Sequence, residues 1–135
     1  MSRVNVLDAS AVIDTLQHEV GQDPVGVALA EAPCWVTAVN LCEVLSKLCE
    51  RGMPLPKAQT AVQVLKMVIV DFDAELAARA ASLRVRTMPI GASLGDRACL
   101  GLAEQAVDAG NETVVYTAER AWAKIEWPFE VIVIR

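Results

Sequence analysis

The 135-residue chain has no long hydrophobic run, although 54% of its residues are hydrophobic. A helix that crosses a bilayer needs about 20 consecutive apolar residues, and no segment of the chain approaches that length. The first residues also lack the basic and then apolar pattern of a secretory signal. The sequence therefore predicts a cytoplasmic protein that does not enter a membrane, and its length fits one domain over residues 1–135.

Disulfide, zinc and triad motifs are missing as well. The chain has four cysteines, Cys34, Cys42, Cys49 and Cys99, which show neither CxxC nor Cys/His spacing and lie in apolar segments. We expect buried, reduced thiols rather than a disulfide framework or a zinc site. The one histidine, His18, offers no catalytic triad, and no glycine-rich phosphate loop is present.

Positive charge is scarce, because 12 Lys and Arg residues against 17 Asp and Glu residues give a net charge of −5. Proteins that hold nucleic acid by general electrostatic attraction present a basic face. A nucleic-acid substrate therefore requires bound cations or a few local basic residues to reverse the sign at the site. The high apolar content, with only 4% aromatic residues, is also typical of a chain that covers part of its surface with a partner or a second copy.

Short apolar segments alternate with helix-period segments along the whole chain, which is the pattern of βα units around a parallel sheet. Strands are expected at residues 4–7, 34–37, 68–70, 113–116 and 131–134. Helices are expected at residues 9–17, 25–31, 39–51, 56–67, 73–84 and 94–109. Residues 85–93, with Pro89 and Gly91, are predicted to form a loop. The fold class is α/β, a three-layer α/β/α sandwich around a parallel sheet of about five strands.

Four acidic residues lie where an apolar run ends or a helical segment begins. Asp8 directly follows the first predicted strand, and Glu119 comes two residues after Thr117, beyond the fourth. Residues just past the carboxyl ends of neighbouring parallel strands line the ligand crevice of such a sheet. Asp96 lies in the first turn of its helix and Glu43 in the early part of its own. All four carboxylates can therefore face one crevice.

Carboxylates gathered in one crevice repel one another unless a cation lies between them. Oxygen ligands suit a hard divalent cation, and a metal held in this way can hydrolyse or transfer phosphate groups. The hydroxyls of Ser10 and Thr117 can orient a carboxylate or a water on the metal. Arg97, next to Asp96, can neutralise a phosphate. The pattern favours a metal-dependent phosphate chemistry.

Each of these residues also has an ordinary structural explanation. Asp8 can be a helix N-cap, and Glu119 can be a first-turn acid favoured by the helix dipole. Ser93 stands three residues before Asp96, which is the spacing of a capping box. Glu43 can be a solvated residue on a helix surface. In the same way, Ser10 and Thr117 can be simple helix caps, and Arg97 can simply form a surface ion pair.

Four segments occur in order across nearly the whole chain: VLDASA at residues 6–11, TAVNLCEV at 37–44, SLGDRACL at 93–100 and VYTAERAW at 115–122. Together they resemble PIN-domain proteins and, more narrowly, VapC-type toxins of toxin–antitoxin pairs. The resemblance implies an α/β/α sandwich and an endoribonuclease that depends on Mg²⁺ or Mn²⁺. It also implies an RNA substrate, a cognate antitoxin protein that blocks the site, and commonly a homodimer.

Carried over by position, the resemblance assigns Asp8, Glu43 and Asp96 to the metal-binding acids of the family. Glu119 falls where the family usually has aspartate, in a TADRAW-like segment that reads TAERAW here. Glutamate keeps the charge but is longer by one methylene. We expect this departure to affect a second metal position more than the activity itself, with Glu119 still contributing to the site.

With the RNA substrate that the resemblance implies, the predicted function is hydrolysis of an RNA phosphodiester, with Arg97, Arg86 and Arg84 helping to place the RNA backbone. A receiver-like phosphoacceptor domain is one alternative, because Asp71 follows a predicted strand. That class has two acids after its first strand, however, and this chain has one. A non-catalytic PIN-like module that binds a partner protein is another alternative, which the glutamate at position 119 favours.

Overall fold

A parallel sheet forms the centre of the computed structural model, which describes residues 2–17 and 22–135. Within these residues the strands are β1 (Arg3–Leu7), β2 (Cys34–Thr37), β3 (Val68–Val70), β4 (Glu112–Thr117) and β5 (Glu130–Val133). They pair in parallel in the order β3-β2-β1-β4-β5. The five predicted strands are confirmed, and each boundary lies within one residue of its expected position.

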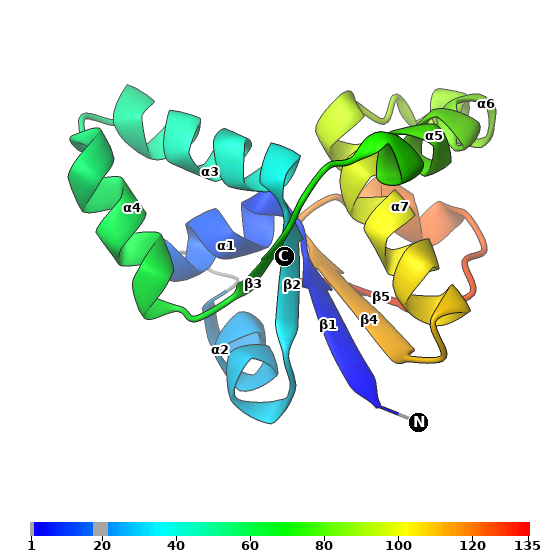
Figure 1. Ribbon diagram of the computed structural model, residues 1–135, viewed down its shortest axis with the longest axis horizontal. Coiled ribbons are helices and arrows are strands. Elements are labelled where there is room, and N and C mark those ends of the chain that lie inside the picture. Colours follow the sequence, from blue (N-terminus) through cyan, green and yellow to red (C-terminus); the bar gives the residue numbers. More distant parts are fainter. Residues whose placement is uncertain (1, 18–21) are drawn as a thin grey trace.

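Helices cover both faces of this sheet, with α1 to α4 on one side and α5 to α7 on the other (Figure 1). Their bounds are α1 (Ala9–Leu16), α2 (Gln22–Glu31), α3 (Ala38–Glu50), α4 (Leu55–Val64), α5 (Ala74–Ser82), α6 (Arg84–Thr87) and α7 (Leu94–Asp108). Two short 3-10 helices are η1 (Met88–Ile90) and η2 (Arg120–Lys124). This is the expected α/β/α sandwich. Across residues 2–17 and 22–135, every helix is too short or too polar to cross a membrane.

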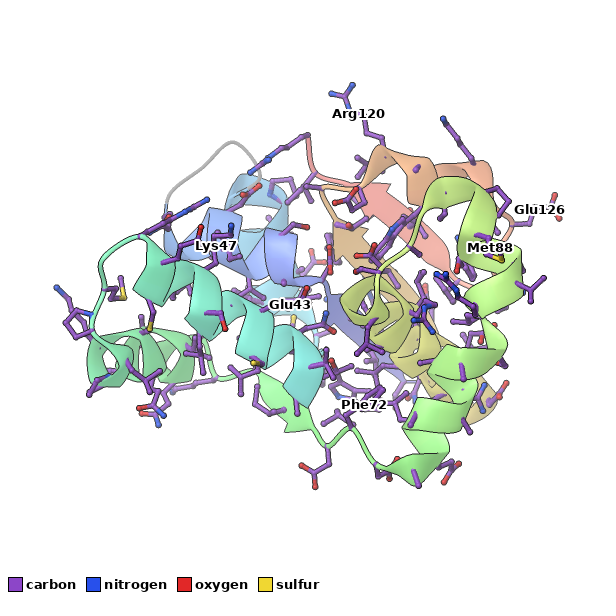
Figure 2. The ribbon with its side chains drawn as sticks, turned by 90° about the horizontal axis from the view of Figure 1, so that it is seen from above. Glu43, Lys47, Phe72, Met88, Arg120 and Glu126 are labelled. Carbon is purple, nitrogen blue, oxygen red and sulfur yellow. The ribbon has the colours of Figure 1, made fainter. Side chains whose placement is uncertain are left out.

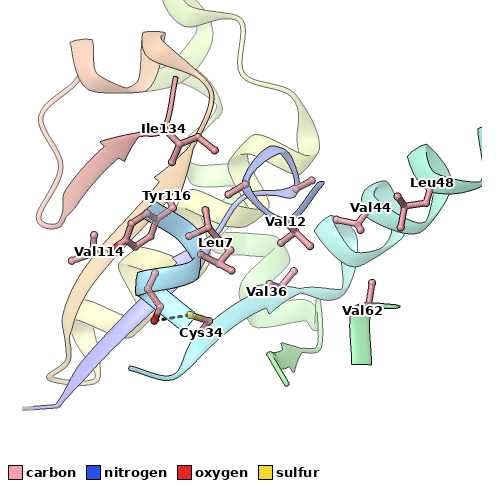
Figure 3. Close-up of a cluster of buried hydrophobic side chains, with 14 of the residues drawn as sticks. Leu7, Val12, Cys34, Val36, Val44, Leu48, Val62, Val114, Tyr116 and Ile134 are labelled. Carbon is pink, nitrogen blue, oxygen red and sulfur yellow. Dashed lines mark hydrogen bonds between the residues drawn. The ribbon is translucent and has the colours of Figure 1, made fainter. Parts of the chain in front are cut away.

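The central strand β1 has no solvated face, because side chains along a strand alternate between the two sides of the sheet. Val4 and Val6 pack with Leu76 of α5 in one core cluster, whereas Leu7 packs with Val12 of α1 in the other (Figure 3). Burial on both faces explains why this strand is a continuous apolar run in the sequence. Asp8 follows that run at once, so a carboxylate is placed at the edge of a fully buried strand.

Residues 85–93 are not the predicted loop. They contain the end of α6 and the 3-10 helix η1, and Gly91 follows in the left-handed conformation with φ 64°. The Thr87 hydroxyl is buried and donates to the Leu83 carbonyl oxygen at 2.8 Å, which secures the turn locally. The prediction of a loop was wrong because Pro89 stops an α-helix but is well tolerated near the start of a new helical turn.

The thiols are all free, as expected, but only two of the four are buried. Cys34 and Cys99 are buried, whereas Cys42 and Cys49 are exposed. The buried stripe of α3 contains Val44 and Leu48. The two exposed thiols lie on other faces of the same helix, so their apolar neighbours in the sequence did not indicate their burial.

Candidate active site

Asp8 is held at the junction of β1 and β4. Its backbone N–H donates to the Tyr116 carbonyl oxygen at 3.0 Å. Asp8 occupies the N-cap position of α1, yet its side chain makes no capping hydrogen bond. Carboxylate oxygen Oδ2 instead accepts from the Ser10 hydroxyl at 2.8 Å and the Thr117 hydroxyl at 3.0 Å. Helix capping therefore does not explain this buried carboxylate.

The hydroxyls of Ser10 and Thr117 also receive backbone donors from the chain beyond β4. Ser10 Oγ accepts from the Ala118 N–H, and Thr117 Oγ1 accepts from the Glu119 N–H, each at 3.0 Å. With those acceptor positions used, each hydroxyl proton is directed at Asp8 Oδ2. The arrangement fits the predicted orienting role of both residues, and capping of a helix by Thr117 is excluded because it lies in β4.

Glu43 lies in the second turn of α3 and reaches the amino end of α7. Thr37, the last residue of β2, caps α3 by accepting from the Asn40 N–H at 3.0 Å. Asn40 Nδ2 then donates to Glu43 Oε1 at 2.8 Å and to the Gly95 carbonyl oxygen at 3.0 Å. In the view from above, Glu43 lies near the middle of the molecule, and Lys47 lies farther out along the same helix (Figure 2).

Asp96 closes the capping box of α7, as its spacing from Ser93 indicated. Ser93 Oγ accepts from the Asp96 N–H at 3.1 Å, and Asp96 Oδ2 accepts from the Ser93 N–H at 2.9 Å. The structural explanation is therefore correct for one oxygen of this carboxylate. The second oxygen, Oδ1, takes no part in the capping box, so capping and a second role are compatible.

The charges of three carboxylates act on one another in this region. Burial raises the pKa of Asp8 to about 7. The charges of Asp96 and Glu43 also raise this pKa, whereas the two hydroxyl hydrogen bonds lower it. Burial raises the pKa of Glu43 as well, and the charge of Asp96 adds to the effect. Asp8, Glu43 and Asp96 thus form one repulsive group, called the acidic group below.

Protein cations do not neutralise the acidic group. The salt bridges found in the described parts of the chain involve other carboxylates, and Lys47 pairs with Glu50 at 3.6 Å. Nor do three acidic, thiol or imidazole side chains among those residues converge closely enough to hold a metal ion directly. Repulsion separates like charges, and the hydrogen bonds above fix each carboxylate in its own place.

The donor set of the acidic group suits a hard cation nonetheless. It consists of carboxylate oxygens, which Mg²⁺ and Mn²⁺ prefer over softer ligands. Mg²⁺ usually keeps several of its waters and uses only one or two protein carboxylates directly. Carboxylates that are close enough to repel but too far apart to share one ion directly fit a hydrated divalent cation, with Asp8, Glu43 and Asp96 as the residues that would hold it.

Among the four expected acids, Glu119 is the one that is not part of the acidic group as defined above. It is exposed and occupies the N-cap position of η2, and its side chain makes no capping hydrogen bond. Its charge is not among those that raise the pKa of Asp8 or Glu43. The explanation as a first-turn acid also fails, because η2 begins one residue later, at Arg120. A contribution of Glu119 to a metal site stays a prediction.

The arginines expected to place a substrate are engaged in packing. Arg97 Nη1 donates to the Ala80 carbonyl oxygen of α5 at 3.3 Å, and its buried Nε has no hydrogen-bond partner. Arg86 pairs with Glu104 of α7 at 3.0 Å and lies 4.5 Å from the centre of the Trp127 ring. Both side chains therefore link helices on the α5–α7 side, and their role toward a substrate stays a prediction.

The topology contradicts the receiver-like alternative. Doubly wound receivers have the strand order 2-1-3-4-5, which places the third strand beside the first. Here β3 is the edge strand, so Asp71, which follows it, is separated from β1 by β2. The single histidine, His18, lies outside the described residues.

Two further residues of the site, Asn40 and Gly95, were not predicted. Asn40 is fully buried although it lies on a helix between two apolar residues, and such burial is rare for asparagine. Its place three residues after the cap Thr37 and three before Glu43 was the available signal, but many asparagines have similar surroundings. Gly95 lies in the first turn of α7, where glycine is unfavourable for the helix. That cost was the signal for a special role.

A family model described as PIN domain matches residues 6–128 of the chain. No curated protein matches the chain by sequence.

Solved structures share its fold. VapBC2 from Rickettsia felis, bound to a DNA fragment from its promoter, is 13% identical with a TM-score of 0.67 over 96% of this chain and 97% of that one. VapC20 from Mycobacterium tuberculosis, a toxin that cleaves the sarcin-ricin loop, is 15% identical with a TM-score of 0.64 over 82% and 86%. A toxin–antitoxin complex from Klebsiella pneumoniae is 18% identical with a TM-score of 0.64 over 93% and 98%.

Proposed function

Because this chain belongs to the PIN-domain family, we propose that it is an endoribonuclease dependent on Mg²⁺ or Mn²⁺ and the toxin of a toxin–antitoxin pair. The observation that carries the proposal is the acidic group of Asp8, Glu43 and Asp96. Two of these carboxylates have raised pKa values, and among residues 2–17 and 22–135 none of the three forms a salt bridge with a protein cation. Such a group is costly for folding alone, and a bound dication relieves the cost.

The chemistry supplied by a divalent cation at this site is Lewis-acid activation of water and of the phosphodiester. The residues of the chain hold the carboxylates in place. Ser10 and Thr117 hold the Asp8 carboxylate, Asn40 holds Glu43, and the capping box holds Asp96. A substrate phosphate is itself anionic, so it can approach these acids only when a cation lies between them.

The proposal includes a cognate antitoxin protein as partner, a homodimer as the commonest assembly of the family, and a cytoplasmic location. The antitoxin is supported by the VapBC and toxin–antitoxin complexes that share this fold. Because the net charge is −5, we expect RNA to be attracted by the bound cation and the basic residues near the site, not by the charge of the whole protein.

A second candidate function is that of a non-catalytic PIN-like module that binds a partner protein. The departure at Glu119 favours this candidate, because this side chain is exposed and its charge is not among those that raise the pKa of Asp8 or Glu43. A module of this kind has no need of a cation, so metal dependence separates the two functions.

The experiment that tests the proposal is incubation of the purified protein with total RNA, with Mn²⁺ or with excess EDTA. The parent should cleave RNA only with the metal, and Asp8→Asn and Asp96→Asn should reduce the rate at least about 100-fold while remaining folded. Asp71→Asn is the matched control, because Asp71 is an exposed acid at the edge of the sheet. Full cleavage in EDTA, or by Asp8→Asn, would contradict the proposal.

A further inference from the structure

Glu43 is the member of the acidic group whose position depends most on its neighbours. Glu43 is exposed on α3, and a glutamate side chain has several rotatable bonds, so its carboxylate is mobile unless other groups hold it. Asp8 and Asp96 have shorter side chains with fewer rotatable bonds. Two residues contact the Glu43 carboxylate: Asn40, which lies one turn earlier in α3, and Gly95, which lies in α7.

The Asn40 amide is fixed in one orientation by its other contacts. Thr37 Oγ1 donates to Asn40 Oδ1 at 2.6 Å, and the amide nitrogen donates to Glu43 Oε1 and to the Gly95 carbonyl oxygen. A flipped amide would turn its oxygen toward two acceptors and lose both bonds. Asn40 and Thr37 are both fully buried, so water cannot replace these partners. The Glu43 carboxylate is therefore bound to a rigid donor.

Gly95 provides the space that the Glu43 carboxylate occupies. A Cβ atom at position 95 would lie 2.3 Å from Glu43 Oε1 and 2.6 Å from Oε2, closer than any real contact of that kind. The Gly95 backbone does not itself require glycine, because its φ is not among the positive values found at Gly52, Gly91 and Gly110. The missing side chain, not the backbone conformation, is what this position needs.

We propose that Asn40 and Gly95 are positioning residues that fix the Glu43 carboxylate in the acidic group as a ligand, direct or through water, for a divalent cation. The role rests on the proposed function. Gly95 directly precedes Asp96, so the contact between α3 and α7 that places Glu43 also sets its position relative to Asp96. Asn40 supplies the hydrogen bond, and Gly95 lets the carboxylate lie against the backbone of α7.

Gly95→Ala tests this role with little risk to the fold. The added methyl group meets the end of a flexible side chain, so Glu43 should move while α7 keeps its place. Gly26→Ala is the matched control, because Gly26 lies in α2 and a Cβ there would have no atom within 4 Å. Calorimetric titration with Mn²⁺ in the absence of RNA should show about 10-fold weaker binding for Gly95→Ala and unchanged binding for Gly26→Ala.

Asn40→Ala tests the hydrogen bond independently. Its matched control is Asn5→Ala, since Asn5 is also fully buried and its Nδ2 donates to the Ala28 carbonyl oxygen at 2.9 Å. Both variants should lower the melting temperature, but only Asn40→Ala should weaken Mn²⁺ binding, again by about 10-fold. In a Glu43→Gln background, Gly95→Ala should produce no further loss of affinity, because the group that it displaces no longer carries the charge.

The outcomes separate the positioning role from the function on which it rests. If the parent binds Mn²⁺ and both Gly95→Ala and Asn40→Ala bind it as tightly, the positioning role is overturned and the proposed function stands. Equal losses in Asn40→Ala and Asn5→Ala would likewise overturn the role of Asn40. A parent that binds no Mn²⁺ would contradict the proposed function and the positioning role together.

Discussion

Asp8 is the residue at which burial and charge conflict most directly. Its pKa is raised by burial from an ordinary value of 3.8 to about 7. Between these two values the folded state binds a proton more readily than the unfolded state, so the stability of the metal-free protein falls as pH rises through this window. Above about pH 7 the carboxylate is charged in both states, and its full cost to folding is present.

We expect Asp8→Asn to stabilise the metal-free protein at pH 8 by roughly 3–4 kcal/mol, because the neutral amide removes the buried charge and keeps an oxygen that can accept from Ser10 and Thr117. The gain should shrink to about 1 kcal/mol at pH 4.5, where Asp8 is protonated in the folded parent. Urea unfolding in EDTA at the two pH values measures both. A gain that is equal at the two pH values, or a loss at pH 8, would contradict the assignment.

Glu119 tests how far the acidic group extends. Since its charge is not among those that raise the pKa of Asp8 or Glu43, Glu119→Gln should lower kcat/KM for RNA cleavage by about 10-fold or less, much less than Asp8→Asn. Single-turnover cleavage with saturating Mn²⁺ gives the comparison. Equal losses in the two variants would show that Glu119 moves into the site when RNA or metal binds.

At the residue level, the sequence supported the grouping of Asp8, Glu43 and Asp96 because Asp8 follows a strand and the other two lie in the early turns of helices. Asn40 and Gly95 were not accessible in this way. Their importance depends on the distance between α3 and α7, and the hydrogen bonds from Asn40 join residues up to 55 positions apart. No local pattern encodes such a contact.

Among the elements, the first turn of α7 affects both the stability of the protein and the acidic group, because its capping box contains Asp96. Ser93→Ala removes the acceptor of the Asp96 N–H, and losses of this kind cost about 1 kcal/mol. It should also free the Asp96 carboxylate to move and weaken Mn²⁺ binding. Urea unfolding and Mn²⁺ titration measure the two effects.

Ser82→Ala, which loses a hydroxyl at the exposed end of α5, is the control and should change neither the stability nor Mn²⁺ binding. Unaltered stability of Ser93→Ala would show that the capping box contributes nothing.

The helices and strands could be predicted well wherever burial produces a regular hydrophobic pattern in the sequence. The central strands β1, β2 and β4 were found because buried strands are apolar runs bounded by turn residues. The edge strands β3 and β5 are more exposed, and their β-branched residues indicated them. The helical segment between α5 and α7 was missed because Pro89 and Gly91 are typical of loops. Thr87 is buried there and its hydroxyl donates to the Leu83 carbonyl oxygen, and sequence propensity does not report such burial.

For the whole molecule, the sheet order decides which side chains meet. β1 and β4 are neighbours, so the residues after them share an edge. Helix α3 comes from one layer and α7 from the other, and they contact each other beside that edge. Sequence patterns alone predict parallel strands but not their order. The resemblance to PIN domains implied the α/β/α sandwich, which the structure confirms, and the strand order comes from the structure.

Metal binding should stabilise the whole domain, because a ligand that binds only the folded state raises the free energy of unfolding. The expected gain is about 2.7 kcal/mol at a Mn²⁺ concentration of 100 times Kd. Differential scanning calorimetry should show a melting temperature that rises with Mn²⁺ in the parent and is nearly constant in Asp8→Asn. A parent with no response to Mn²⁺ would favour the non-catalytic module.

The central claim is that carboxylates from the end of β1, from α3 and from α7 hold a divalent cation between them. The most direct measurement is a crystal structure of the protein soaked in Mn²⁺, with the metal located by its anomalous scattering. We predict a peak within direct or one-water contact of Asp8 and Asp96, with Glu43 on its third side. If no anomalous peak lies beside Asp8 at saturating Mn²⁺, or if the peak lies elsewhere on the molecule, the central claim is contradicted.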